Sequence, residues 1–160
     1  MSKLFVDDIV EKTSGNGVQI PGHAVQYART YVANSPVIES TSTSFVGSGI
    51  TASITPTKSG SLILIDLCLT MVDCTVDTIN IQMYQLIAGG SYSVMAGANG
   101  YLSGIQSGIR WSPNVFSGSY TTTSTSALTF QPYFKSSGGG NVRIVHDSSS
   151  YSLTLTEIAQ

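Results

Sequence analysis

The 160 residues are enough for one sandwich-sized domain with a short appendage, but not for two full domains. Only 10% of the residues are charged and 41% are apolar, which excludes disorder, because disordered chains combine low hydrophobicity with high net charge. The net charge is −2 and the seven Lys and Arg residues are scattered, which excludes a basic nucleic-acid surface. Abundant Thr and Ser suit strands and turns better than helices, so the composition predicts an all-β protein.

Residues 1–23 form a separate arm in the sequence pattern. Residues 4–10 predict a short strand, residues 14–17 a hairpin-type turn, and residues 18–20 a returning strand. A hairpin of this length cannot bury enough apolar surface to be stable alone, so it must lie against the main domain or another chain. We expect its apolar side chains to make that assembly or docking contact: Leu4, Phe5, Val6, Ile9, Val18 and Ile20.

The remaining residues, 24–160, predict one β-sandwich domain. Strands are expected about ten residues apart, at 24–32, 43–55, 60–72, 78–88, 91–96, 109–120, 125–135, 141–146 and 151–158. Apolar residues nowhere recur at helical spacing over three turns, so almost no helix is expected. The low-complexity tract 117–126 is typical of an edge strand or surface loop with hydroxyl side chains.

The strand at 60–72 is the most apolar of the series. One face carries Ile63, Ile65, Leu67, Leu69 and Met71, and the other carries Leu62, Leu64, Asp66, Cys68 and Thr70. Apolar residues on both faces predict a central strand that is covered on both sides over part of its length. In the last strand, Leu153 and Leu155 alternate with polar residues, which predicts a single buried face.

No feature predicts export or membrane insertion. The first twelve residues contain acids and lack an apolar core of signal-peptide length. The longest apolar run, residues 62–69, is interrupted by Asp66 and is too short to span a bilayer. We therefore expect a protein made in a host cytoplasm, with Cys68 and Cys74 as reduced thiols.

Catalytic and metal-binding chemistry is weakly represented, and we expect neither an enzyme nor a cofactor. No Ser lies in a nucleophile elbow, His23 follows a Pro-Gly pair, and His146 and Asp147 are expected on opposite faces of one strand. Asp73 and Asp77 flank a predicted turn and could share Ca²⁺, but two acids in a turn are more often simply solvated. No metal site is predicted.

Aromatic residues in turn-rich segments are the remaining candidates for recognition. Tyr92, Tyr101 and Trp111 combine an apolar ring with a polar tip or edge, which suits stacking on sugars or contact between subunits. The alternative is that Trp111 and some of the tyrosines pack in the core or an interface. Both interpretations stay open from the sequence.

Several segments together resemble small structural proteins of tailed bacteriophages. The opening LFVDDIVEKTSGNGVQIPGHAVQ resembles a recurrent N-terminal motif of that group. The segments ITPTKSGSLILI, YFKSSGGGNVRIVHD and SLTLTEIAQ resemble the domain that follows it, and the resemblance covers nearly the whole chain. The region 97–117 is less typical of the group.

The resemblance implies a trimeric, jelly-roll-like sandwich in a phage particle, with the N-terminal hairpin docking on other virion proteins. Three-fold packing also suits a small sandwich, because it covers edges and an apolar flank. The leading hypothesis is a fibre or tip-like protein that contacts host-surface polysaccharide. The alternatives are a capsid decoration (cement) protein, and a carbohydrate-binding module or depolymerase carried on the particle.

Overall fold

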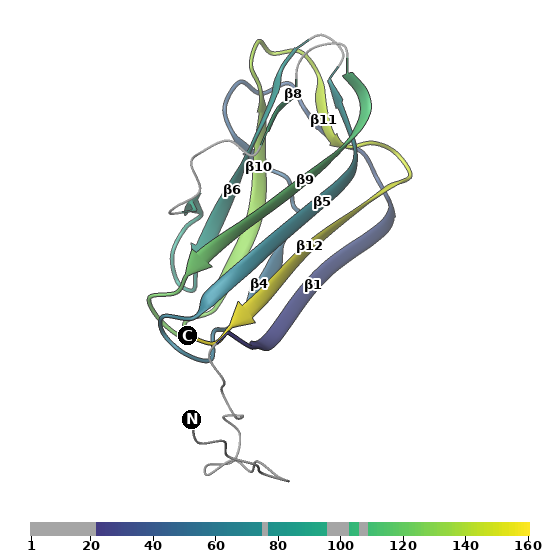
Figure 1. The fold of residues 1–160 in the computed structure, drawn as a ribbon. Coiled ribbons are helices and arrows are strands. Elements are labelled where there is room, and N and C mark those ends of the chain that lie inside the picture. The colour runs from purple at the N-terminus through teal and green to yellow at the C-terminus, as the bar shows by residue number, and fades with distance from the viewer. Residues whose placement is uncertain (1–21, 75–76, 96–102, 106–108) are drawn as a thin grey trace, which may run out of the picture.

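The chain folds as an all-β sandwich of two antiparallel sheets, as expected. The computed structural model describes residues 22–74, 77–95, 103–105 and 109–160, with the backbone alone at 103–105 and 109–111. No helix occurs in these ranges. None of the described residues forms a helix that could cross a bilayer. Figure 1 shows the strands of the first sheet side by side, in the order β9, β5, β12 and β1.

The first sheet has four strand positions. Its edges are β9 (Ile109–Thr121) and β1 (Ala24–Ser35), and β5 (Leu62–Cys74) and β12 (Ser149–Ile158) lie between them. The short strand β11 (Val142–Val145) pairs with the last residues of β5, on the same side of β5 as β12. Strand β2 (Ile38–Ser40) pairs with β11 in the position next to it. All of these pairs are antiparallel.

The second sheet is built on two long strands. β10 (Leu128–Ser136) pairs along its length with β6 (Ile79–Ile87). On the far side of β10 lie β3 (Val46–Gly47) and β4 (Ala52–Ile54), and on the far side of β6 lie β7 (Ser93–Val94) and β8 (Ser103–Ile105). Each sheet thus has four strand positions, and the chain changes sheet between successive positions except from β6 to β7 and β8, which is the connectivity of a jelly roll.

The core lies between the two sheets. The first sheet contributes the predicted face of β5, namely Ile63, Ile65, Leu67 and Leu69, together with Leu153 and Leu155 of β12. The second sheet contributes fully or almost fully buried residues from β6 and β10: Ile79, Ile81, Met83, Leu128, Phe130 and Phe134. The predicted inward faces of β5 and β12 are confirmed, except at Met71, which is half-buried because the register shifts after Leu69 and Val72 takes the buried position.

The two ends of the sandwich differ. At the proximal end, where β1 begins and β12 ends, the N–H of Gly22 donates to the carbonyl of Ala159 (2.8 Å). The N–H of Ala159 in turn donates to the carbonyl of His23 (2.9 Å). The connections 55–61, 88–92 and 122–127 lie at this end, and 41–45 and 137–141 lie at the other, distal end.

Three sequence predictions about strands are corrected. The strand expected at 43–55 is broken into β3 and β4, because Gly49 adopts a φ of +78° and bends the chain. The short strands β2 and β8 were not predicted. Coverage of β5 on both sides is wrong for most of its length, because Leu64, Asp66 and Thr70 are exposed.

Cys68 and Cys74 cannot form a disulfide with each other in this fold. Both lie in β5, where six residues of extended chain separate their Cα atoms by about 20 Å. A disulfide requires Cα atoms within about 7 Å. Burial raises the pKa of the Cys74 thiol, whose Sγ–H donates to the carbonyl of Asp77.

The tract 117–126 spans the end of the edge strand β9 and the connection to β10.

Candidate interaction surfaces

The structure describes only part of the predicted site. Leu4, Phe5, Val6, Ile9, Val18 and Ile20 of the arm lie outside the described residues, as does Tyr101. Trp111 is described by its backbone alone, at the distal end of β9 beside the pair formed by Val72 and Ser112. Tyr92 is fully described, in the connection between β6 and β7. These predicted contacts therefore remain predictions, and Tyr92 leads to the first surface.

Tyr92 belongs to an aromatic cluster on the outer face of the second sheet. Tyr84 of β6 and Tyr133 of β10 stack with ring centroids 4.0 Å apart and planes 19° apart. Tyr92 tilts against Tyr133 at 5.7 Å, and Phe45 tilts against Tyr84 at 6.2 Å. The two outer rings come from connections, so this aromatic cluster (Phe45, Tyr84, Tyr92 and Tyr133) covers the middle of that face.

The environment of the cluster favours packing. Burial raises the pKa of Tyr92, and the neighbouring Tyr133 is a second cause of the same sign. The ammonium of Lys135 lies 5.0 Å from the ring centre of Phe45, a cation–π contact. Sequence analysis found Tyr92 but not its partners, although the alternation in β6 and β10 puts Tyr84 and Tyr133 on one outer face.

The outer face of the first sheet is the second surface, which we call the open face. Strand register places its side chains in three cross-strand rows: Tyr27, Thr156, Leu64 and Ser119; Arg29, Thr154, Asp66 and Ser117; and Tyr31, Ser152, Cys68 and Val115. Most of these side chains are Ser, Thr or Tyr. The face is therefore rich in hydroxyl groups and carries two charged side chains within these rows.

Large apolar and aromatic groups are exposed on the open face. The exposed fractions are 71% for Tyr27, 57% for Tyr31 and 67% for Val115. The guanidinium of Arg29 lies 5.1 Å from the ring centre of Tyr31, and the hydroxyl of Ser117 donates to the carboxylate of Asp66. Sequence analysis missed the β1 residues, although their spacing of two residues was the available signal.

At the proximal end, a buried carboxylate fastens β12 to its surroundings. Glu157 is fully buried, and its carboxylate accepts hydrogen bonds from the side-chain N–H of Gln26 (2.6 Å) and the hydroxyl of Thr57 (2.8 Å). Desolvation raises the pKa of Glu157, but the nearby hydroxyl of Ser61 and the hydrogen bonds from Gln26 and Thr57 outweigh it and leave the pKa below its usual value. The group joins β1, β12 and the connection after β4.

At the distal end, Asp77 organises the triglycine turn that follows β10. Its carboxylate accepts hydrogen bonds from the hydroxyl of Ser136 and from the backbone N–H groups of Thr78, Gly138 and Gly140. The hydroxyl of Ser136, followed by these N–H groups, lowers the pKa of Asp77 to about 2. The carboxylate thus acts as a fixed negative centre for the turn.

Asp73 and Asp77 do not form the calcium pair considered from the sequence. Asp73 accepts a hydrogen bond from Arg143 (3.1 Å), and Arg143 also donates to Glu39 (2.8 Å). This hydrogen bond from Arg143 is the main cause that lowers the pKa of Glu39. Among the described residues, no group of three or more His, Cys, Asp or Glu side chains is placed to hold a metal ion.

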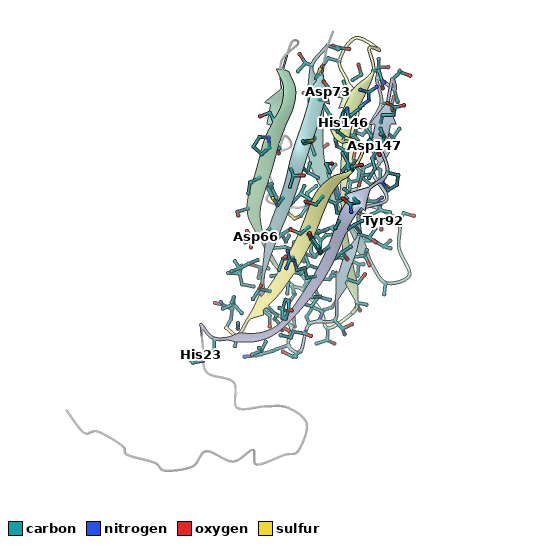
Figure 2. All side chains as sticks on the ribbon, turned by 90° about the vertical axis from the view of Figure 1, so that its right-hand side faces the viewer. His23, Asp66, Asp73, Tyr92, His146 and Asp147 are labelled. Carbon is teal, nitrogen blue, oxygen red and sulfur yellow. The ribbon has the colours of Figure 1, made fainter. Side chains whose placement is uncertain are left out.

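The histidines lie at different places on the sandwich. Figure 2 shows His23 at the proximal end, and His146, Asp147 and Asp73 toward the distal end. The placement of His146 and Asp147 on one strand was wrong, because both lie in the turn between β11 and β12. The carbonyl of His146 accepts hydrogen bonds from the N–H (3.0 Å) and hydroxyl (2.6 Å) of Ser149, which close that turn.

Comparison with known proteins gives structural similarities alone. No protein-family model matches the chain, and no curated protein matches it by sequence. A structure of the infectious bursal disease virus VP2 subviral particle is similar with a TM-score of 0.46 and 11% identity over 85% of this chain. A structure described as "CBM4 structure and function" gives 0.32 and 12% over 83% of this chain and 92% of its own.

The enzymatically active domain of tailspike protein 4 from bacteriophage CBA120 gives a TM-score of 0.33 and 10% identity over 87% of this chain and 20% of its own. The chain spans 34% of the VP2 chain. At these identities and TM-scores, the similarities do not indicate a shared function.

Proposed function

We propose that the protein is a non-enzymatic structural component of a bacteriophage particle, a trimeric fibre or tip-like protein attached by its arm. The observation that carries the proposal is the place where the arm joins the jelly roll. Gly22 and His23 are hydrogen-bonded to Ala159 at the proximal end, so the arm enters at that end. An anchor there leaves the distal end facing away from the particle.

The distal end is the part that we propose to contact the host surface. The backbone of Trp111 lies there, in the first residues of β9. The end also carries Glu39, whose carboxylate accepts hydrogen bonds from the side chains of Asn141 and Arg143. Aromatic rings bind sugars through matched apolar surfaces, and amide and charged groups add hydrogen bonds. Host-surface polysaccharide is therefore the ligand class we propose.

Attachment is tested by deleting residues 1–22 and comparing incorporation into particles with that of the full chain. We expect the truncated protein to fold, as judged by its circular dichroism and cooperative melting, and to be absent from purified particles. The charge-neutral arm variant Phe5→Ser is a milder test, because it removes one predicted contact and leaves the backbone intact. Normal incorporation of the truncated protein contradicts the anchor.

Copy number per particle separates a fibre from a capsid decoration protein. Quantitative mass spectrometry of purified particles should give a few to tens of copies for a fibre and hundreds for a decoration protein. Host contact is tested with the purified protein on host cells and on isolated surface polysaccharide. We expect Trp111→Ala to weaken binding about thirtyfold, because truncation of an aromatic hot spot costs about 2 kcal/mol. Equal binding by both proteins contradicts the contact.

A further inference from the structure

We infer that the open face is the surface through which copies of this chain pack against one another. The inference rests on the proposed oligomer and goes beyond it by assigning the interface to the first sheet. It also proposes that two halves of the face contact each other between copies. The β1 half consists of Tyr27, Arg29 and Tyr31, and the β5 half consists of Leu64 and Asp66 of β5 with Val115 of the neighbouring β9.

The first argument is the mismatch between the sequence of β5 and its cover. Apolar residues on both faces are typical of strands that are buried on both sides. Within the described part of one chain, only the inner face of β5 is covered, and Leu64 on the outer face is 36% exposed. A second copy over this face would supply the cover that the sequence of β5 predicts.

The second argument is the difference between the two outer faces. On the second sheet, the aromatic cluster covers the middle of the outer face with rings from two connections. On the first sheet, Tyr27, Tyr31 and Val115 remain more than half exposed. Covering aromatic and aliphatic groups of this size with a second copy is favourable, because it removes apolar surface from water. The open face therefore has an apolar surface that the described part of the chain leaves uncovered.

The third argument is the complementarity of the two halves. Arg29 and Asp66 lie in one cross-strand row on either side of Thr154, about 10 Å apart at two strand spacings. The two groups form no ion pair with each other in the described part of the chain, so each can meet the opposite charge of another copy. When the β1 half of one copy lies over the β5 half of the next, Arg29 meets Asp66 and Tyr27 meets the row of Leu64.

The composition of the β1 half suits such a contact. Interfaces between proteins are enriched in Tyr and Arg, which this half supplies, and depleted in Lys, Glu, Asp and Ser. Between the two halves, Ser152, Thr154 and Thr156 have short side chains that allow close approach and offer hydroxyl groups for hydrogen bonds. Such a contact can be reciprocal between two copies, or it can repeat head-to-tail from copy to copy and close into a ring when the rotation closes. A trimer is one such ring.

The test compares two exposed valines on opposite sheets by light scattering and sedimentation of the full-length protein. Val115 lies on the open face, and Val94, which is 43% exposed, lies on the second sheet. Val115→Lys should raise the concentration at which the oligomer dissociates at least tenfold, and the matched control Val94→Lys should leave it unchanged. Both variants should keep the circular dichroism spectrum of the wild type, because both side chains are exposed in the single chain, and only Val115→Lys should lose the part of the melting temperature that association contributes.

Charge exchange and thiol protection provide independent measurements. Asp66→Arg should weaken the oligomer, and adding Arg29→Asp should restore it, because the pair is exchanged. Cys68 lies in the open face and Cys74 is fully buried. A maleimide should therefore modify Cys68 slowly in the wild-type oligomer and faster in Val115→Lys, with Cys74 protected in both. This second measurement also applies if the arm alone keeps the Val115→Lys variant oligomeric.

The outcomes separate this inference from the proposed oligomer. A wild-type oligomer whose mass and Cys68 reactivity are unaffected by Val115→Lys overturns the open face as the interface and leaves the oligomer standing. A wild-type monomer at micromolar concentration overturns both. A monomer that binds host polysaccharide and loses that binding in Val115→Lys would assign the face to a glycan instead.

Discussion

The buried carboxylate of Glu157 lies 2.9 Å from the backbone nitrogen of Thr57, which donates a hydrogen bond to it across 100 residues of sequence. The hydroxyl of Thr57 and the side chain of Gln26 donate to the same carboxylate. These bonds hold the end of β12 to the start of β1 and to the connection before β5. Gly22 and His23, which follow the arm, are hydrogen-bonded to Ala159 at the same end, so the proximal end is stabilised where we propose that the arm anchors the protein.

We predict that Glu157→Gln lowers the free energy of unfolding by about 2 kcal/mol. Hydrogen bonds to a charged acceptor are worth about 1.5–3 kcal/mol, and the amide of Gln directs an N–H at a donor. The measurement is chemical denaturation at pH 7. Glu39→Gln is the control, because Glu39 lies on the surface at the distal end. An equal effect of both changes would contradict a special role for Glu157.

Glu157 should also make stability depend on pH. Its pKa in the folded protein lies below the usual value of 4.5, so the stability it contributes is present above that pH. This contribution is lost as the pH falls through the folded pKa. We expect the melting temperature of the wild type to drop more steeply below pH 4.5 than that of Glu157→Gln. Parallel curves for the two proteins would contradict the assignment.

The carboxylate of Asp77 is expected to stay ionised at acidic pH and so to keep its hydrogen bonds to the distal turn. Because its pKa is about 2, compared with 3.8 for an unperturbed group, its contribution is present above pH 3.8 and is lost as the pH approaches 2. Asp77→Ala should accelerate hydrogen exchange at the N–H groups of Gly138 and Gly140, which would lose their acceptor. Exchange at Leu67 in the centre of β5 serves as the internal reference and should change much less.

Leu67→Ala should destabilise the fold by about 2–5 kcal/mol, since it removes buried methyl groups and leaves a cavity. Leu67 is fully buried on the inner face of β5, between β9 and β12. Thermal melting is the measurement. The control is Leu64→Ala on the outer face of the same strand, which should cost clearly less in a monomeric sample. A similar loss for both leucines would mean that the inner face is not the core.

Tyr84 and Tyr133 should show energetic coupling in a double-mutant cycle. Stacked aromatic pairs are worth about 0.5–1.5 kcal/mol beyond their area burial, and these rings are 4.0 Å apart. The cycle uses Tyr84→Ala, Tyr133→Ala and the double variant, with chemical denaturation as the measurement. A second cycle of Tyr84 with Tyr27, on the other sheet, should give no coupling. Zero coupling in both cycles would show that the stack contributes nothing.

The sequence was sufficient for the fold class because the strands alternate strongly. Ile63 to Leu69 and Leu153 with Leu155 identify inner faces through a period of two residues, and the structure confirms both. The short strands were harder to predict from the sequence. β3 and β4 were predicted as one strand because the bend at Gly49 depends on a backbone angle that the residue permits but does not require.

The surfaces were less predictable, because they depend on which strands become neighbours. Tyr84 and Tyr133 are 49 residues apart, and their stack exists only because β6 pairs with β10 in one register. The same holds for Arg29 and Asp66, which share a row through β12. Asp77 likewise meets the triglycine turn through a contact between distant loops. A single sequence carries no record of such pairings.

The hydrogen bonds that join Gly22 and His23 to Ala159 have a practical consequence for engineering the protein. Since the first and last strands end side by side, a short linker between residues 160 and 22 could join them into a circularly permuted jelly roll. New termini opened in the surface connection 122–127 would leave the Asp77 turn intact. A peptide inserted near residue 139 would instead be displayed at the distal end, but the insertion would disrupt the turn that Asp77 holds.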